Sequence, residues 1–222
     1  ILSLKDDNNF LKSIPSTAEH TFALFLVLSK NILRSFQDVK EMYWRRNLFL
    51  GFEAKGLHFG IIGYGRIGKI LGKIAKGFGM KILFYDLKKN KNQTSLDKLL
   101  RKSDVISLNI NYIPKNINFI NKTHFKKMKK TSFFINCSRG ENVNQKDLLF
   151  ALKSKTIAGA ALDVLQEDSL WFNKIPKKHK DIIHYSKRNS NLIITPHIGG
   201  YTRQALVNTF ERIIIKMIRF IK

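Results

Sequence analysis

The 222-residue chain has one cysteine, Cys137, and few acidic residues. A single thiol excludes an internal disulfide framework and fits a reducing compartment, so we expect a cytoplasmic protein. No apolar run reaches the ~18 residues that a membrane-spanning helix needs, and no segment has the pattern of a signal peptide. The sequence therefore predicts a protein with no membrane partner. Its first residue is Ile1 rather than methionine, which suggests a fragment.

The shortage of acids gives a formal net charge of +24, from 40 Lys and Arg against 16 Asp and Glu. Such an excess is typical of proteins that bind nucleic acids or anionic membranes. Here the lysines are scattered, and no basic run is interleaved with aromatic side chains as a single-strand binding groove requires. We interpret the excess as solvated lysine faces and expect no nucleic-acid partner.

The most informative stretch is residues 57–86, where a short apolar run leads directly into the glycine turn GYGRIG at 63–68. Apolar residues then recur at helical spacing, and a second apolar run at 81–85 ends on Asp86. This order predicts a strand, a tight turn, a helix and a second strand. It is the order in which a dinucleotide-binding site is built.

Each residue type in this turn has a physical role. Gly63 permits the sharp turn, Gly65 lets a pyrophosphate approach the backbone, and Gly68 lets the helix pack closely on the strand. Asp86 lies about 20 residues further on, where a carboxylate accepts hydrogen bonds from the ribose hydroxyls of NAD. Its negative charge predicts that NAD binds better than NADP, although Lys88 and Lys89 can soften that preference.

The rest of the chain alternates between predicted strands and helices, which predicts an α/β fold. We expect a Rossmann-like, doubly wound parallel sheet with helices on both faces. A further segment, 165–190, has no clear period and is predicted as a loop with a short helix. Strands are predicted at 58–62, 81–85, 104–110, 131–136, 157–162 and 191–195, with helices at 67–78, 95–102, 121–128 and 144–153.

Helices are also predicted at both ends of the chain. Residues 16–19, with the sequence STAE, have the pattern of a capping box that opens a helix running to about residue 36. Residues 22–28 are apolar on every side, which predicts burial all round. From residue 202 onward, apolar positions at helical spacing predict an amphipathic helix.

Ligands of such sheets bind at the carboxyl ends of the strands, so residues at those ends are the candidates for chemistry. Arg139 can grip a carboxylate through two parallel hydrogen bonds, and its alternative is a surface ion pair. His197 is placed to act as a general acid and base, and its alternative is a loop histidine without a role. No His or Cys cluster has metal-site spacing, so we expect no metal. The strand-end residues are Gly63, Asp86, Asn109, Arg139, Asp163 and His197.

Four segments in order resemble the D-isomer-specific 2-hydroxyacid dehydrogenases, the family that includes D-3-phosphoglycerate and D-lactate dehydrogenases. They are STAEHTFALFL, GIIGYGRIG with Asp86, INCSRGENVNQKDLLFALKSKTIAGAALDV and NLIITPHIGG. The resemblance implies an NAD-binding domain at 15–200 beside a smaller substrate domain. Residues 1–14 would be a remnant of that second domain, and 201–222 a helix returning toward it. It also implies a homodimer formed through the helix that begins at residue 17.

The resemblance also implies site roles. Arg139 would hold the carboxylate of the 2-oxo acid and polarise its carbonyl, and His197 would protonate the carbonyl oxygen. Asp168 stands where the family has the catalytic Glu that pairs with this histidine, with Glu167 as the alternative acid. Asp163 would orient the nicotinamide carboxamide. The cofactor-binding set would be Gly63, Gly65, Arg66, Ile67, Gly68, Asp86, Asn109, Cys137, Asp163, Gly199 and Gly200.

Two functions follow from this resemblance. The first is an NAD-dependent oxidoreductase that interconverts a small D-2-hydroxy acid and its 2-oxo acid, which Arg139 and His197 favour. The alternative is an NAD(H)-binding module with little or no turnover. The exchange of Glu for Asp at position 168 and the shortened N-terminal region favour this alternative.

Overall fold

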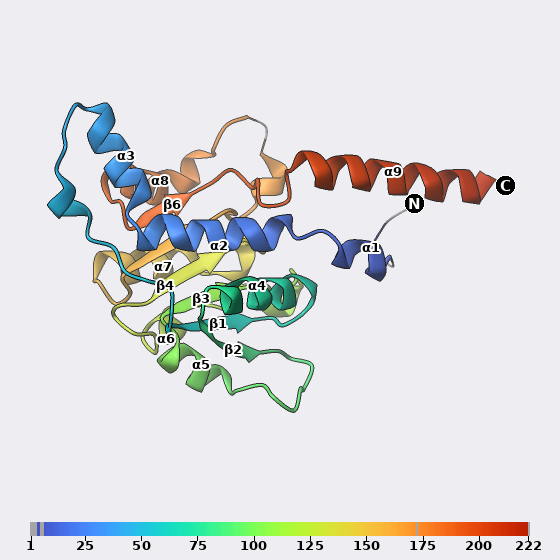
Figure 1. The fold of residues 1–222 in the computed structure, drawn as a ribbon, viewed down its shortest axis with the longest axis horizontal. Helices are drawn as coiled ribbons and strands as arrows, with labels where there is room; N and C mark the ends of the chain where they lie inside the picture. Colours follow the sequence, from blue (N-terminus) through green and yellow to red (C-terminus); the bar gives the residue numbers. More distant parts are fainter. Residues whose placement is uncertain (1–3, 5–6, 172, 222) are drawn as a thin grey trace.

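A parallel β-sheet forms the centre of the computed structural model, which describes residue 4 and residues 7–171 and 173–221 (Figure 1). Its six strands lie in the order β2-β1-β3-β4-β5-β6, and every neighbouring pair is parallel. This arrangement confirms the predicted doubly wound α/β fold. The strands are β1 (His58–Ile62), β2 (Lys81–Tyr85), β3 (Val105–Leu108), β4 (Phe133–Asn136), β5 (Gly159–Leu162) and β6 (Leu192–Ile194).

Helices cover both faces of the sheet. Neighbouring residues of a strand point to opposite faces, so each strand contributes side chains to both of the cores beneath these helices. In β4, Ile135 faces a core that also contains α2 (Ser16–Ser29) and α4 (Arg66–Gly77). Phe134 faces the opposite core, and both side chains are fully buried. The helices of that second face are α5 (Leu96–Lys102), α6 (Lys122–Phe125), α7 (Gln145–Lys153) and α8 (Lys180–Arg188).

The start of α2 differs from the predicted capping box. Pro15 is the N-cap, and its carbonyl accepts the amides of Ala18 and Glu19 at 2.8 and 3.0 Å. The Ser16 hydroxyl is buried and has no hydrogen-bond partner among the described residues. The prediction was wrong because Pro15 already has helical dihedral angles. Ser16 is therefore the first helical residue, not the extended residue that a side-chain cap requires.

The helix also ends earlier than predicted, at Ser29 rather than near residue 36. Asn31 has a φ of 53°, a left-handed conformation that commonly terminates helices, and α3 (Ile32–Lys40) follows it. Burial of α2 is extensive but not complete, because Ala23 is exposed. The apolar residues of its buried face are Ala18, Phe22, Leu24, Phe25 and Leu28.

The segment 165–190 follows the prediction of a loop with a short helix, because its described residues form a loop that ends in α8. Residues 44–56, between α3 and β1, form a loop with one 3₁₀ turn. The 3₁₀ turns are η1 (Arg46–Phe49), η2 (Pro114–Asn116), η3 (Gly140–Asn142), η4 (Asp168–Leu170) and η5 (Lys177–His179).

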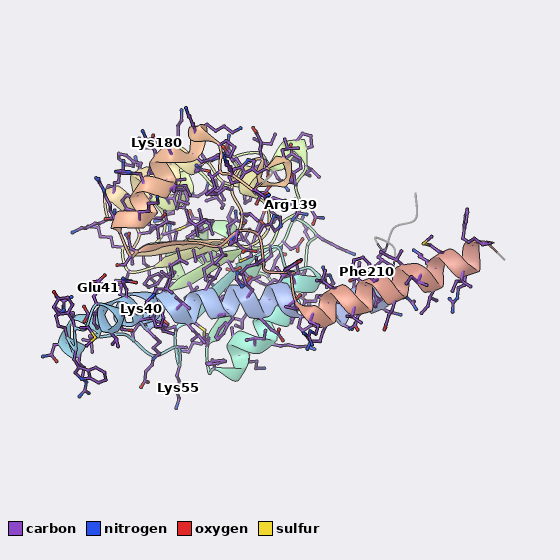
Figure 2. All side chains as sticks on the ribbon, turned by 90° about the horizontal axis from the view of Figure 1, so that it is seen from above. Lys40, Glu41, Lys55, Arg139, Lys180 and Phe210 are labelled. Atoms are coloured by element: carbon purple, nitrogen blue, oxygen red, sulfur yellow. The ribbon has the colours of Figure 1, made fainter. Side chains whose placement is uncertain are left out.

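The predicted C-terminal helix is confirmed as α9 (Arg203–Ile221), which extends away from the sheet (Figure 1). Near it lies α1 (Asn8–Lys12), and an ion pair joins Arg212 to Asp7, whose pKa is lowered by this contact. Phe210 on α9 is 63% exposed (Figure 2). The return of this helix toward a substrate domain stays a prediction. Residues 1–3 and 5–6 of the predicted remnant lie outside the described part of the chain.

Among the described residues, no helix is long and apolar enough to cross a membrane.

The aromatic core under α2 gives a stability prediction. Phe25 is fully buried, and its ring centroid lies 5.5 Å from that of Phe22 and 6.1 Å from that of Phe59. Phe25→Ala should lower the free energy of unfolding by about 3–5 kcal/mol, because it leaves a cavity. Urea denaturation measures this loss. The matched control is Phe150→Ala at a 54% exposed position, where we expect less than about 1 kcal/mol; equal losses would contradict the packing.

Candidate functional site

The carboxyl ends of the strands meet at the edge of the sheet from which α9 departs (Figure 1). The chain leaves β1 for β2 on one side and then reaches β3 on the other, so the strand order reverses beside β1. In open parallel sheets this reversal opens a crevice for ligands. The candidate site therefore has one half beside β1 and a second half at the ends of β4, β5 and β6.

The glycine turn after β1 is shaped by close backbone contacts. Gly63 has a φ of +91°, and a Cβ there would lie 2.6 Å from the carbonyl oxygen of Asn109. A Cβ at Gly68 would lie 2.3 Å from the Gly63 carbonyl oxygen, so the helix packs directly on the turn. Beside Gly65, by contrast, a Cβ would meet no atom within 4 Å. The turn thus leaves the N-terminus of α4 open to an anion.

Asp86 fixes this turn from the end of β2. One oxygen, Oδ2, accepts the amide of Tyr64 at 2.7 Å, and Oδ1 accepts the amide of Lys88 at 3.0 Å. Gly63, Gly65 and Asp86 line a cavity of about 250 Å³ with the half-buried Asn109. Each carboxylate oxygen keeps a further lone pair for a ribose hydroxyl. The open turn and the acid therefore fit a dinucleotide.

Two other residues predicted to bind the cofactor direct their side chains elsewhere. Arg66 donates from Nη1 to the carbonyls of Leu11 at 2.8 Å and Ile14 at 3.4 Å, and burial lowers its pKa. Ile67 packs against the core shared with α2. Both lie in the first turn of α4, where backbone N–H groups lack partners within the helix. Their contribution to a cofactor site therefore stays a prediction that concerns these amides and not the two side chains.

The loop after β4 presents Arg139. Asn136 holds this loop, because its Oδ1 accepts the amide of Ser138 at 3.0 Å and its Nδ2 donates to the Arg139 carbonyl at 2.9 Å. A Cβ at Gly140 would lie 2.0 Å from the carbonyl carbon of Leu165, so only glycine fits there. The Arg139 side chain is exposed at the end of the domain near α9 (Figure 2).

Cys137, in the same loop, is buried against α2, and burial raises its pKa to about 12. It is therefore unreactive as a nucleophile.

His197 follows β6 in a left-handed conformation with a φ of 55°. Its Nδ1 lies 3.1 Å from Oδ2 of Asp168, with the histidine side chain 42% exposed and the acid 12%. Glu167 instead forms an ion pair with Lys178, which lowers the pKa of this carboxyl. Of the two acids considered from the sequence, the structure therefore brings Asp168 and not Glu167 to the histidine.

Asp163 is the most deeply placed acid of the site, with 1% of its side chain exposed. It accepts hydrogen bonds from the Thr195 hydroxyl at 2.6 Å and from the amides of Ile198 at 3.0 Å and Gly199 at 2.7 Å. Burial raises its pKa, but these bonds and a contact with His20 outweigh burial, so that the pKa is lowered. The carboxylate is thus ionised and bound to the loop that carries His197.

Sequence reasoning missed His20, whose Nε2 lies 3.1 Å from Oγ1 of Thr195 and 3.2 Å from Oδ1 of Asp163. The available signal was a histidine at the start of an otherwise apolar helical stretch. The same helix also reaches Gly200, where a Cβ would lie 3.7 Å from Oγ1 of Thr17.

Within the described ranges, no three His, Cys, Asp or Glu side chains come together to hold a metal.

Comparison with known proteins places this geometry in a family. Residues 22–199 match the family model described as "D-isomer specific 2-hydroxyacid dehydrogenase, NAD binding domain". The chain belongs to the D-isomer-specific 2-hydroxyacid dehydrogenases. This membership confirms the resemblance of the four sequence motifs, and the match to the NAD-binding domain confirms the predicted cofactor.

Similar members of the 2-hydroxyacid dehydrogenase family include a glyoxylate reductase of Thermococcus litoralis, 33% identical over 93% of this chain and 64% of its own length. A D-3-phosphoglycerate dehydrogenase of Synechocystis sp. is 34% identical over 87% of this chain and 34% of its own. The chain thus spans between about one third and two thirds of these relatives. A D-lactate dehydrogenase of Aquifex aeolicus, solved with NAD and lactic acid, has a TM-score of 0.86 at 33% identity, covering 95% of this chain and 67% of that one.

The position of Asp86 predicts which cofactor this family member prefers. NADH should bind more tightly than NADPH, because the carboxylate faces the position of the additional phosphate. Asp86→Asn keeps an acceptor for the Tyr64 amide and removes the negative charge. It should therefore reduce the ratio of the dissociation constants for NADPH and NADH by about tenfold. Fluorescence titrations with both cofactors measure it.

The control for this titration is Asp97→Asn, which neutralises an acid of α5 that is paired with Arg101 and Lys127. We expect it to leave the preference unchanged. Equal or tighter binding of NADPH by the unaltered chain would refute the role of Asp86.

Proposed function

We propose that this chain is the NAD-binding part of an enzyme that interconverts a small D-2-hydroxy acid and its 2-oxo acid. The observation that carries the proposal is the His197–Asp168 pair, which lies at the same edge of the sheet as the open glycine turn. NAD, when bound along the turn and Asp86, supplies the hydride acceptor or donor of this chemistry. The residues of the chain bind, orient and move a proton.

His197 is the proposed acid and base. Because Nδ1 contacts Asp168, the ring orientation is fixed and Nε2 is left to exchange a proton with the substrate oxygen. In the direction of reduction the proton moves from Nε2 to the carbonyl oxygen, and in oxidation it returns from the hydroxyl. Asp is one methylene shorter than Glu, yet from η4 its carboxylate reaches the imidazole.

Arg139 is the proposed carboxylate ligand. Its planar guanidinium is exposed at the edge of the sheet, and Asn136 and Gly140 hold the loop beneath it. A guanidinium in this place can bind the carboxylate of a 2-oxo acid through two parallel hydrogen bonds. The positive charge of the guanidinium also favours polarisation of the 2-oxo carbonyl beside that carboxylate. Glyoxylate and pyruvate are the simplest acids with the required carboxylate and adjacent carbonyl.

The proposed reaction predicts a separation between cofactor binding and turnover. The 222-residue chain should bind NADH, and NADH oxidation with glyoxylate or pyruvate should be fast only when the chain is joined to a substrate domain of the family. That domain would exclude water and position the acid, effects that are worth about 7–11 kcal/mol of barrier. In the joined protein, His197→Ala should slow oxidation by about 10²- to 10⁴-fold with unchanged NADH binding.

The matched control is His184→Ala, which removes an exposed histidine of α8 and should leave the rate unchanged. NADH binding without turnover in both preparations would favour the alternative of a binding module. Equal specific activity in both would contradict the need for a second domain.

A homodimer is the proposed assembly, and most of its proposed surface lies within the segment from residue 17 to about residue 36 that the sequence predicted as one helix. The structure divides this segment into α2 and α3, and the apolar side of α2 is largely buried in its own domain. Exposed apolar side chains lie on α3, at the end of the domain opposite α9, where Figure 2 labels Lys40 and Glu41. They are Ile32, Leu33, Phe36 and Val39, each at least 45% exposed. Such a patch is typical of an interface.

We expect light scattering at micromolar concentration to report a dimer. Phe36→Glu, at a 61% exposed position, should shift the protein toward monomer, because a carboxylate in an apolar interface is strongly unfavourable. Phe150→Glu on α7, 54% exposed, is the control and should not. A clean monomer for the unaltered chain would refute the dimer.

A further inference from the structure

We infer that His20 is a positioning residue that tethers the loop carrying His197 to helix α2. The imidazole acts through Thr195 and the buried Asp163 and does not reach the substrate. Its importance for turnover rests on the proposed function, whereas the tether is a property of the folded chain and is tested without turnover.

Hydrogen-bond chemistry identifies the donor and the acceptor in each contact of this tether. The ionised carboxylate of Asp163 only accepts, so the Thr195 hydroxyl, 2.6 Å away, must donate to it. That hydroxyl oxygen can then only accept from His20, whose Nε2 lies 3.1 Å away. Oδ1 of Asp163 lies 3.2 Å from the same nitrogen. His20 therefore carries a hydrogen on Nε2 and shares it between two acceptors.

Asp163 in turn holds the backbone on both sides of His197. Its main-chain carbonyl accepts the amide of His197 at 2.8 Å, and its carboxylate accepts the amides of Ile198 and Gly199. His197 itself has a φ of 55°, a conformation that is unfavourable for a residue with a side chain and persists only where the surroundings enforce it. Asp163 thus holds the loop that carries His197 in place through hydrogen bonds.

His20 completes the set of donors that a buried carboxylate needs. Asp163 is 1% exposed, so a donor that is lost here is poorly replaced by water. The imidazole also packs on the loop, because a Cβ at Gly199 would lie 3.3 Å from Cδ2 of His20. The contact joins residues 175 positions apart in the sequence. It sets the position of the loop relative to the sheet face that α2 covers.

Amide hydrogen exchange of the 222-residue chain tests the tether. In His20→Leu, the amides of Ile198 and Gly199 should exchange at least about tenfold faster than in the unaltered chain, because the loop opens locally. This factor is taken relative to any change in the exchange of the β4 amides. His20→Gln places an amide N–H near the former Nε2 and should restore most of the protection. Leu28→Ala, which removes a buried side chain of the same helix, should accelerate β4 and the loop together.

A double-variant cycle with Thr195→Val separates the tether from general packing. Because His20 and Thr195 contact each other and the same carboxylate oxygen, their effects should not multiply: the factor by which His20→Leu accelerates the exchange of the Gly199 amide should change by more than about twofold once Thr195 is replaced. Full additivity would overturn the proposal, as would a Gln variant that behaves like the Leu variant. So would loop exchange in His20→Leu that rises no more than that of β4. In the joined enzyme, the tether predicts that His20→Leu lowers kcat and that His20→Gln restores most of it.

Discussion

The buried carboxylate of Asp163 is the constraint on which the His197 half of the site depends. A charge that is removed from water must be satisfied by hydrogen bonds, and here the donors come from the end of β6, from the loop beyond it and from α2. Each donor is therefore fixed in space by the same two oxygens. These hydrogen bonds stabilise the unfavourable left-handed backbone conformation of His197.

Acidic residues are scarce in this chain, and several of them accept hydrogen bonds from backbone amides. Asp86 binds the amide of Tyr64 in the glycine turn, and Asp168 accepts the amide of Leu165 at 3.3 Å. At the opposite end of β1, Asp104 accepts the amide of His58 at 2.8 Å. In a chain with a net charge of +24, these few carboxylates thus occur where loops must hold a fixed shape.

The two halves of the site are built by different physical means. The cofactor half relies on absence of side chains, since Gly63 and Gly68 bring the helix and the neighbouring strand end into contact closer than any Cβ allows. The half around His197 relies on contacts between polar side chains of different loops, as in the contact between His197 and Asp168. Parallel strands unite both halves, because they place every loop that follows a strand at one edge.

The sequence by itself determined the strands, the glycine turn and the family, because periodicity and turn chemistry act between residues near one another in the chain. It also located Arg139, Asp163 and His197 at strand ends. Only the tertiary structure decided between Asp168 and Glu167, since Lys178 and the left-handed backbone of Glu167 direct that side chain away from the histidine.

Two further features were decided only in the folded chain. The part played by His20 depends on a partner 175 residues away, a distance at which no local pattern carries information. The entry into α2 at Pro15 and the break at Asn31 depend on backbone angles that the sequence pattern also permitted otherwise. Local chemistry therefore specified the elements and the candidates, while packing across the sheet chose which polar side chains meet.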